Sequence, residues 1–179
     1  MDPETEMGPL SNFKQLEVIE KNIKETIDQG GKIKCGGERH SFSNKGYYFP
    51  PTIIECDNHN LPVAENELFG PVLSVRSFSS EAEAVLEANS TKFGLASTVM
   101  SSDPAKAMRV ANRIRAGAVY ATSTGEGILA EHPAVSRGGF GCSGVGRELG
   151  ISGLHEYTEL KSVNYTGFTL ADAKIESVE

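Results

Sequence analysis

The stretch "PVLSVRSFSSEAEAVLEANSTKFGLASTVMSSDPAKAMRVANRIRAGAVYAT", residues 71–122, decides the fold. Short apolar and β-branched runs alternate in it with longer amphipathic runs, as strands alternate with helices. We expect strands at 71–78, 95–100 and 118–122, and helices at 79–90 and 103–117. Strands joined by helices of this length form right-handed crossovers within a parallel sheet. The stretch therefore predicts an α/β fold with a parallel, doubly wound sheet.

Local signals mark the ends of both expected helices. Ser80 and Glu83 have the spacing of a capping box at the start of the first helix. Asp103 stands at the cap position of the second helix, Pro104 in its first turn and Gly117 at its exit. Both helices are thus bounded by residues whose chemistry suits those positions.

One more helix is expected upstream, over residues 11–29. Its apolar positions recur at near-helical spacing and are Leu16, Ile19, Ile23 and Ile27. Ser11 or Asn12 can cap its start, and Gly30-Gly31 ends it.

Two extended segments follow this helix. Residues 32–37 predict a short strand with Ile33 and Cys35 on one side. Residues 46–56 are aromatic and β-branched, but Pro50-Pro51 should keep them out of a central strand, because proline cannot donate to a sheet ladder.

Composition narrows the class of protein. The chain has 179 residues, 39% hydrophobic and 23% charged, which fits a globular domain. Its net charge of -7 argues against nucleic-acid binding, and no apolar run is long enough to span a membrane. The three widely spaced cysteines predict neither a disulfide framework nor a metal site, and they fit the reducing cytoplasm.

Residues 136–150, "SRGGFGCSGVGRELG", contain a G-x-G-x-x-G pattern at Gly139, Gly141 and Gly144. A dinucleotide fingerprint needs a strand directly before it and a helix directly after it, and neither is expected here. We favour tight turns and close backbone approach. An independent nucleotide-binding role for this stretch is the alternative.

Cys142 lies inside the same stretch and raises the question of a nucleophile. A thiol needs a neighbouring base or helix N-terminus to become reactive. None of the four histidines has a spacing that indicates a pair with it. We therefore interpret Cys142 as a small packed residue.

Several ordered motifs resemble the NAD(P)-dependent aldehyde dehydrogenase superfamily. They are "ENELFGPVLSVRSF" (65–78), "EAVLEANSTKFGLASTVMSSD" (83–103) and "GGFGCSGVGRELGISGLHEYTELKSV" (138–163). The resemblance runs from about residue 2 to residue 165 and implies the Rossmann-like α/β sheet of that family's catalytic domain. It covers only the C-terminal portion of such an enzyme, downstream of the catalytic cysteine.

The resemblance implies a reaction that this chain cannot complete alone. The family oxidises an aldehyde to a carboxylic acid through a cysteine thiohemiacetal and thioester, with NAD or NADP as cofactor. The family's nucleophilic cysteine and glutamate base lie upstream, and Cys35, Cys56 and Cys142 do not match the nucleophile's position. We expect no catalytic residue here and an inactive isolated chain.

Two cofactor-binding residues follow from the resemblance. Glu67 matches the glutamate that holds the hydroxyls of the nicotinamide-side ribose, and Phe69 matches the aromatic residue near the nicotinamide ring. A carboxylate accepts two hydroxyl donors at once, which suits that role. The alternatives are that Glu67 is a surface acid and that Phe69 belongs to the core.

The chain departs from the family pattern near its glycine-rich stretch. Ser136, Arg137 and Gly141 replace a common proline, phenylalanine and lysine, and Thr122 replaces a frequent asparagine. The phenylalanine position lines the aldehyde pocket in the family. We therefore hypothesise that Arg137 faces the substrate and favours a polar or carboxylate-bearing aldehyde, the alternative being a solvated arginine.

The expected layout has five parts. They are a linker (1–12), the α/β portion (13–125), a glycine-rich loop with a short helix (126–158), an oligomerisation strand (159–167) and a tail (168–179). The linker-like start suggests a chain that begins partway through a larger protein. The strand at 160–166 should join a homo-oligomer or the missing N-terminal portion. The alternative function is a non-catalytic module that associates with full-length subunits.

Overall fold

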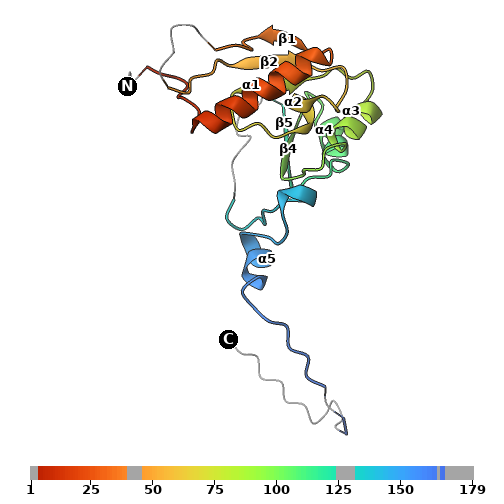
Figure 1. The fold of residues 1–179 in the computed structure, drawn as a ribbon. Helices are drawn as coiled ribbons and strands as arrows, with labels where there is room; N and C mark the ends of the chain where they lie inside the picture. The colour runs from red at the N-terminus through yellow and green to blue at the C-terminus, as the bar shows by residue number, and fades with distance from the viewer. Residues whose placement is uncertain (1–3, 40–45, 124–131, 165, 168–179) are drawn as a thin grey trace.

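The computed structural model describes residues 4–39, 46–123, 132–164 and 166–167. Helix α1 (Phe13–Asp28) packs across a three-stranded sheet, and a second, two-stranded sheet lies beside it with helices α3 and α4 (Figure 1). The core joins α1 to strand β2 and the short helix α2 (Pro62–Glu65). Its buried residues are Leu16, Ile19, Ile23, Phe49, Ile54, Cys56, Leu61 and Val63.

The predicted first helix is confirmed. Asn12 is its cap, because its side-chain oxygen accepts a hydrogen bond from the backbone N–H of Gln15 at 2.9 Å. The helix ends at Asp28, and Gly30 adopts a positive φ of 101° directly after it. Ile27 differs from the prediction, because it lies at the edge of the apolar face and remains exposed.

The first sheet has the order β1-β2-β3, with β1 at Lys32–Cys35, β2 at Thr52–Glu55 and β3 at Val72–Val75. β2 runs antiparallel to β1 and parallel to β3. The prediction that Pro50-Pro51 would keep this segment out of a central strand is wrong. Both prolines precede the strand, and the first N–H of β2, that of Thr52, donates to the carbonyl of Pro71 at 2.8 Å.

The second sheet pairs β4 (Ala96–Met100) with β5 (Ala118–Thr122) in parallel. The expected helices are α3 (Glu81–Ala88), capped by Ser80, and α4 (Pro104–Ala111), capped by Asp103. α4 ends at Ala111, so the exit predicted at Gly117 is wrong.

The prediction of one continuous doubly wound sheet is only partly confirmed. The fold is α/β with parallel pairing, but β3 and β4 belong to separate sheets. The crossover through α3 therefore joins strands that are not neighbours within the described residues. Sequence indicates which segments are strands, whereas pairing depends on contacts that are distant along the chain.

The C-terminal part leaves the body of the molecule. After α5 (Gly150–His155) and a turn at 156–157, residues 159–164 run as an extended segment without a strand partner among the described residues (Figure 1). Leu160 and Val163 are exposed there. The strand predicted at 159–167 is not formed among residues 159–164 and 166–167, and Tyr165 lies outside the described residues. A strand of this kind forms only when it pairs with another strand.

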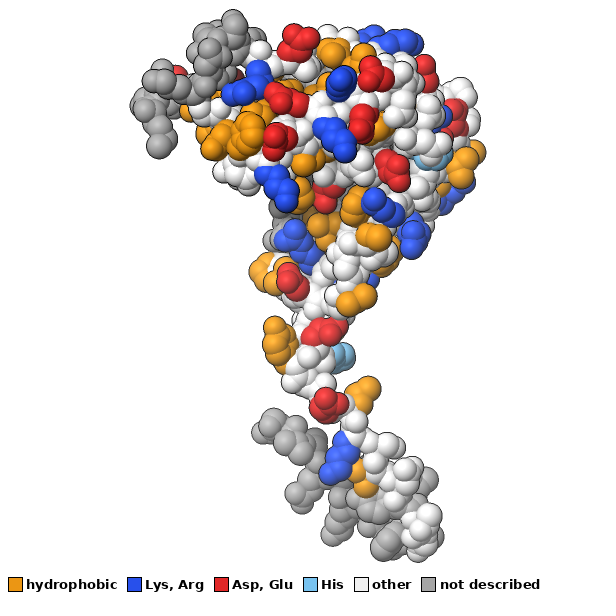
Figure 2. Space-filling view, in the orientation of Figure 1, with side chains coloured by type: hydrophobic (Ala, Val, Ile, Leu, Met, Phe, Trp, Pro, Cys, Tyr) orange, Lys and Arg blue, Asp and Glu red, His pale blue; other side chains and the backbone are white. Residues whose placement is uncertain are grey.

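The described surface mixes charges of both signs. Figure 2 shows Lys and Arg side chains interspersed with Asp and Glu over the visible face of the body. None of the described helices has both the length and the apolar character needed to cross a bilayer.

Candidate functional site

Glu67 and Phe69 lie on the connection between α2 and β3. Both side chains are exposed, and Phe69 keeps 72% of its surface open. The alternative that Phe69 belongs to the core is therefore wrong. The connection ends at Gly70, where a Cβ atom would overlap Ile19 Cδ1 and lie 2.9 Å from Leu10 Cδ2. Glycine lets this turn rest directly on the core.

Glu67 lines a hollow of about 640 Å³ beside β4. The other polar or sulfur-bearing side chains of its wall are Thr91, Ser97, Arg115, Cys142 and Ser143. Phe69 and Arg137 do not contribute to the wall formed by the described residues. A carboxylate at the edge of such a hollow can accept hydrogen bonds from two hydroxyl groups of one ligand.

Cys142 and Ser143 of the glycine-rich stretch line the same hollow, and backbone bonds hold the stretch against the residues before β4. The N–H of Phe140 donates to the carbonyl of Gly94 at 2.9 Å, and the N–H of Cys142 donates to that of Lys92 at 2.9 Å. Ser143 Oγ accepts from the Gly94 N–H at 3.0 Å. These amides already have partners, so the observed conformation does not offer them to a phosphate, which favours the turn interpretation.

Cys142 has no histidine beside it in the described part of the chain. Its thiol is exposed, so the interpretation of Cys142 as a packed residue is wrong, and no histidine lines the hollow to which it belongs. No group of three or more potential metal ligands occurs among the described residues. The three cysteines are all free, and burial raises the pKa of the Cys56 thiol. The described lining of that hollow thus supplies no histidine to activate the Cys142 thiol.

Asn89 has a role that sequence reasoning missed. Its Nδ2 donates to the carbonyl of Arg113 at 2.8 Å, and its Oδ1 accepts from the N–H of Arg115 at 2.6 Å. The side chain thereby ties the end of α3 to the connection that follows α4. The motif around Asn89 was recognised, but a partner 24 residues away leaves no local signal.

Arg137 lies apart from the Glu67 hollow. Its backbone pairs with Glu148 in an antiparallel bridge, with N–H to carbonyl distances of 2.8 and 2.7 Å. Its exposed side chain borders two smaller hollows, of about 440 and 290 Å³. The larger one shares Leu95 and Ser143 with the Glu67 hollow. The structure therefore places Arg137 next to the candidate cofactor region without joining it.

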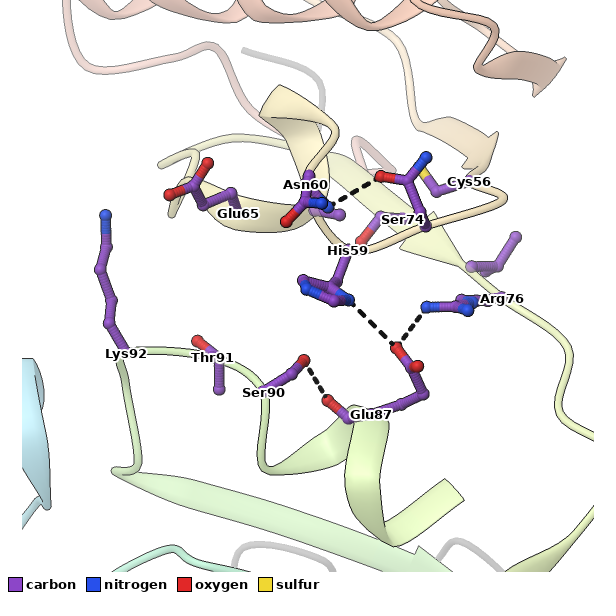
Figure 3. A pocket seen from close by; sticks show the side chains of 13 residues that line it. Cys56, His59, Asn60, Glu65, Ser74, Arg76, Glu87, Ser90, Thr91 and Lys92 are labelled. Carbon is purple, nitrogen blue, oxygen red and sulfur yellow. Dashed lines mark hydrogen bonds and ion pairs between the residues drawn. The ribbon is translucent and has the colours of Figure 1, made fainter. Parts of the chain in front are cut away.

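A further polar pocket of about 370 Å³ lies between β3 and α3 (Figure 3). Glu87 pairs there with Arg76, and His59 Nδ1 lies 3.7 Å from the same carboxylate. Ser90 Oγ donates to the Glu87 carbonyl at 2.7 Å. The ion pair between Arg76 and Glu87 links the end of β3 to α3. The sequence alone does not indicate this contact, because its partners are 11 residues apart.

Residues 1–163 match the aldehyde dehydrogenase family. This chain belongs to that family. It is 43% identical over 163 residues to a (Z)-2-((N-methylformamido)methylene)-5-hydroxybutyrolactone dehydrogenase of Acinetobacter baylyi, covering 90% of this chain and 32% of the relative. It is 41% identical to a betaine aldehyde dehydrogenase of Bacillus subtilis, covering 89% of this chain and 32% of that protein. The expected family is confirmed.

Solved aldehyde dehydrogenases share this fold. The betaine aldehyde dehydrogenase of Staphylococcus aureus in complex with NAD+ superposes with a TM-score of 0.79 at 34% identity, covering 94% of this chain and 35% of that one. The Mycobacterium tuberculosis aldehyde dehydrogenase complexed with NAD+ gives 0.82 at 33% identity, covering 94% and 34%. The chain spans about a third of the length of the aldehyde dehydrogenases it matches.

Proposed function

We propose that this chain is the C-terminal portion of an NAD(P)+-dependent aldehyde dehydrogenase, which oxidises an aldehyde to a carboxylic acid. The observation that carries the proposal is the pair Glu67 and Phe69, both exposed on a turn that Gly70 seats on the core. An exposed phenylalanine and a carboxylate at one turn have no evident structural role, but they suit a ligand with a flat ring and adjacent hydroxyls.

The residues present fit the cofactor. Glu67 would accept hydrogen bonds from both hydroxyls of the nicotinamide-side ribose, and Phe69 would hold the ring region by apolar contact. The bound NAD(P)+ supplies the hydride acceptor of the reaction. This chain would bind the cofactor and orient it. A carboxylate suits that task, because hydrogen bonds to a charged acceptor are stronger than those to a neutral one.

The nucleophile and the general base lie outside this chain under the proposal. Cys35 is exposed at β1, Cys56 is buried, and Cys142 has no histidine beside it in the described residues. Aldehyde oxidation in this family needs a cysteine thiolate to form the thiohemiacetal and a base to release the acid from the thioester. We expect the isolated chain to be inactive.

The two separate sheets support an incomplete domain. Parallel strands in α/β proteins are covered on both faces, yet no residue of β4 or β5 is fully buried in the described structure. Helix α4 packs against this two-stranded sheet, and further cover would stabilise the sheet more. The remaining portion of the enzyme would supply it, and residues 160–166 would pair with another subunit.

The alternative function is a non-catalytic module that associates with full-length subunits. The extended C-terminal segment, with Leu160 and Val163 exposed, favours it. Mixing the chain with the upstream portion of a family member, and separately with full-length subunits, separates the two proposals. Restored turnover in the first mixture supports a portion of the enzyme, whereas no restoration there, with unchanged or reduced turnover in the second, supports the module. The hypothesis that Arg137 favours acidic or polar aldehydes fails if Arg137→Ala keeps the same preference between acidic and neutral substrates.

Glu67→Gln tests the proposed function in an enzyme made by joining this chain to the upstream two thirds of the Bacillus subtilis relative. Losing a charged acceptor costs about 1.5–3 kcal/mol, so the KM for NAD+ should rise about tenfold to hundredfold. Glu65→Gln is the matched control, because this exposed acid lies two residues away and does not line the Glu67 hollow. Equal KM values in both variants would refute the assignment of Glu67.

A further inference from the structure

One face of α1 contacts the segment that carries Glu67. Ile19, Asn22 and Thr26 are spaced three and four residues apart and so lie on one side of the helix. Thr26 is fully buried, and its Oγ1 accepts a hydrogen bond from the Val63 N–H at 3.1 Å. Ile19 underlies Gly70 at the other end of the segment. Both ends of the connection are thus anchored on α1.

Asn22 reaches the middle of that segment. Its Oδ1 accepts a hydrogen bond from Asn66 Nδ2 at 3.0 Å, and its own Nδ2 donates to the Val18 carbonyl at 2.8 Å. The bond to Val18 fixes which way the amide points, so the oxygen is the group that faces Asn66. Asn66 directly precedes Glu67 along the chain.

We propose that Asn22 is a positioning residue for Glu67, which rests on the proposed function of Glu67 in cofactor binding. Val63 is buried, and Leu68 packs against the core, so the fold of the segment does not depend on Asn66. The bond between the two asparagines instead restricts the residues between those anchors. It lowers the number of conformations that the Glu67 backbone can adopt, so less conformational entropy is lost when the carboxylate binds a ligand.

The first test uses the 179-residue chain itself. Asn22→Ala should speed hydrogen exchange of the Asn66 backbone amide, which donates to the Pro62 carbonyl at 3.0 Å, while exchange in β4 stays unchanged. Thermal stability should not fall, because alanine has a higher helix propensity than asparagine. Lys21→Ala is the matched control, since this side chain on the same helix is exposed. Unchanged exchange at the Asn66 amide would overturn the proposal.

The second test measures kinetics in the joined enzyme described above. Asn22→Ala should raise the KM for NAD+ about three- to tenfold, as expected for one neutral hydrogen bond, with a smaller change in kcat. The double variant Asn22→Ala/Asn66→Ala should be no worse than either single variant, because both remove the same bond.

The outcomes separate this inference from the proposed function. If Glu67→Gln raises the KM for NAD+ and Asn22→Ala does not, the positioning role is wrong and the proposed function stands. If Glu67→Gln has no effect on that KM, the proposed function fails, and this inference fails with it. If Asn22→Ala raises the KM and also lowers kcat and thermal stability to a similar extent, the residue is merely structural and the positioning role is overturned.

Discussion

Gly117 lies where β5 begins and where the glycine-rich stretch crosses it. Its N–H donates to the Gly94 carbonyl at 3.0 Å. A Cβ atom at this position would overlap the Gly138 carbonyl oxygen and lie 2.7 Å from the Gly138 carbonyl carbon. Because the obstacle is backbone, no side-chain rotation can relieve the overlap. Gly117→Ala should therefore separate the two segments or strain both.

The expected cost follows from two opposing effects. Overpacking lowers the free energy of unfolding by about 1–3 kcal/mol. We expect a value near the upper end for Gly117→Ala, because the overlapping atoms belong to the backbone. Alanine offsets about 0.4–1 kcal/mol of that cost by restricting the unfolded chain. The net loss should be about 2 kcal/mol, which shifts the urea midpoint by about 1 M at a slope of about 2 kcal/mol/M.

Urea unfolding of the chain, followed by circular dichroism, measures this loss. Gly8→Ala is the matched control, because nothing lies within 4 Å of a Cβ atom there, and it should leave the midpoint unchanged or slightly raised. If Gly117→Ala unfolds at the same urea concentration as Gly8→Ala, the stretch does not cross β5 as described. The explanation of its glycines as sites of close backbone passage would then be refuted.

Two further substitutions test the contacts that hold the described body together. Thr26→Val leaves the Val63 N–H without its hydroxyl partner in the core and should cost about 1–3 kcal/mol in denaturant unfolding, whereas Thr26→Ser should cost less. The hydrogen bond from Arg109 lowers the pKa of Glu81 from its ordinary value of 4.5. Because the pKa of Glu81 is lower in the folded state than in the unfolded state, its ionised form stabilises the fold above the unfolded-state pKa. The stability advantage over Glu81→Gln should therefore be present at neutral pH and disappear as the pH falls through the folded-state pKa. A difference that persists in acid would contradict this origin.

Local chemistry accounts for what could be predicted from the sequence. Ser80 and Asp103 each cap a helix through atoms within three residues of themselves, so short-range spacing is sufficient to place the starts of α3 and α4. The error at Pro50-Pro51 arose because the strand begins immediately after the second proline, where the missing N–H has no consequence.

Long-range pairings account for what could not be predicted. The separation of β3 from β4 depends on which edges meet in space. The bonds of Asn89 and Asn22 join residues 24 and 44 positions apart, and such side-chain pairs leave no periodic signal. Glu67 and Phe69 are candidate residues because they belong to a motif that resembles the family's, and only the structure shows that both are exposed.

The most direct test of the central claim is NADH formation from an aldehyde by this chain alone and by the same chain joined to the upstream two thirds of the Bacillus subtilis relative. The account predicts no turnover by the chain alone, because it contributes Glu67 but neither the nucleophile nor the base. It predicts turnover by the joined protein. NADH formation by the isolated chain, or an inactive joined protein that is correctly folded, would contradict the account.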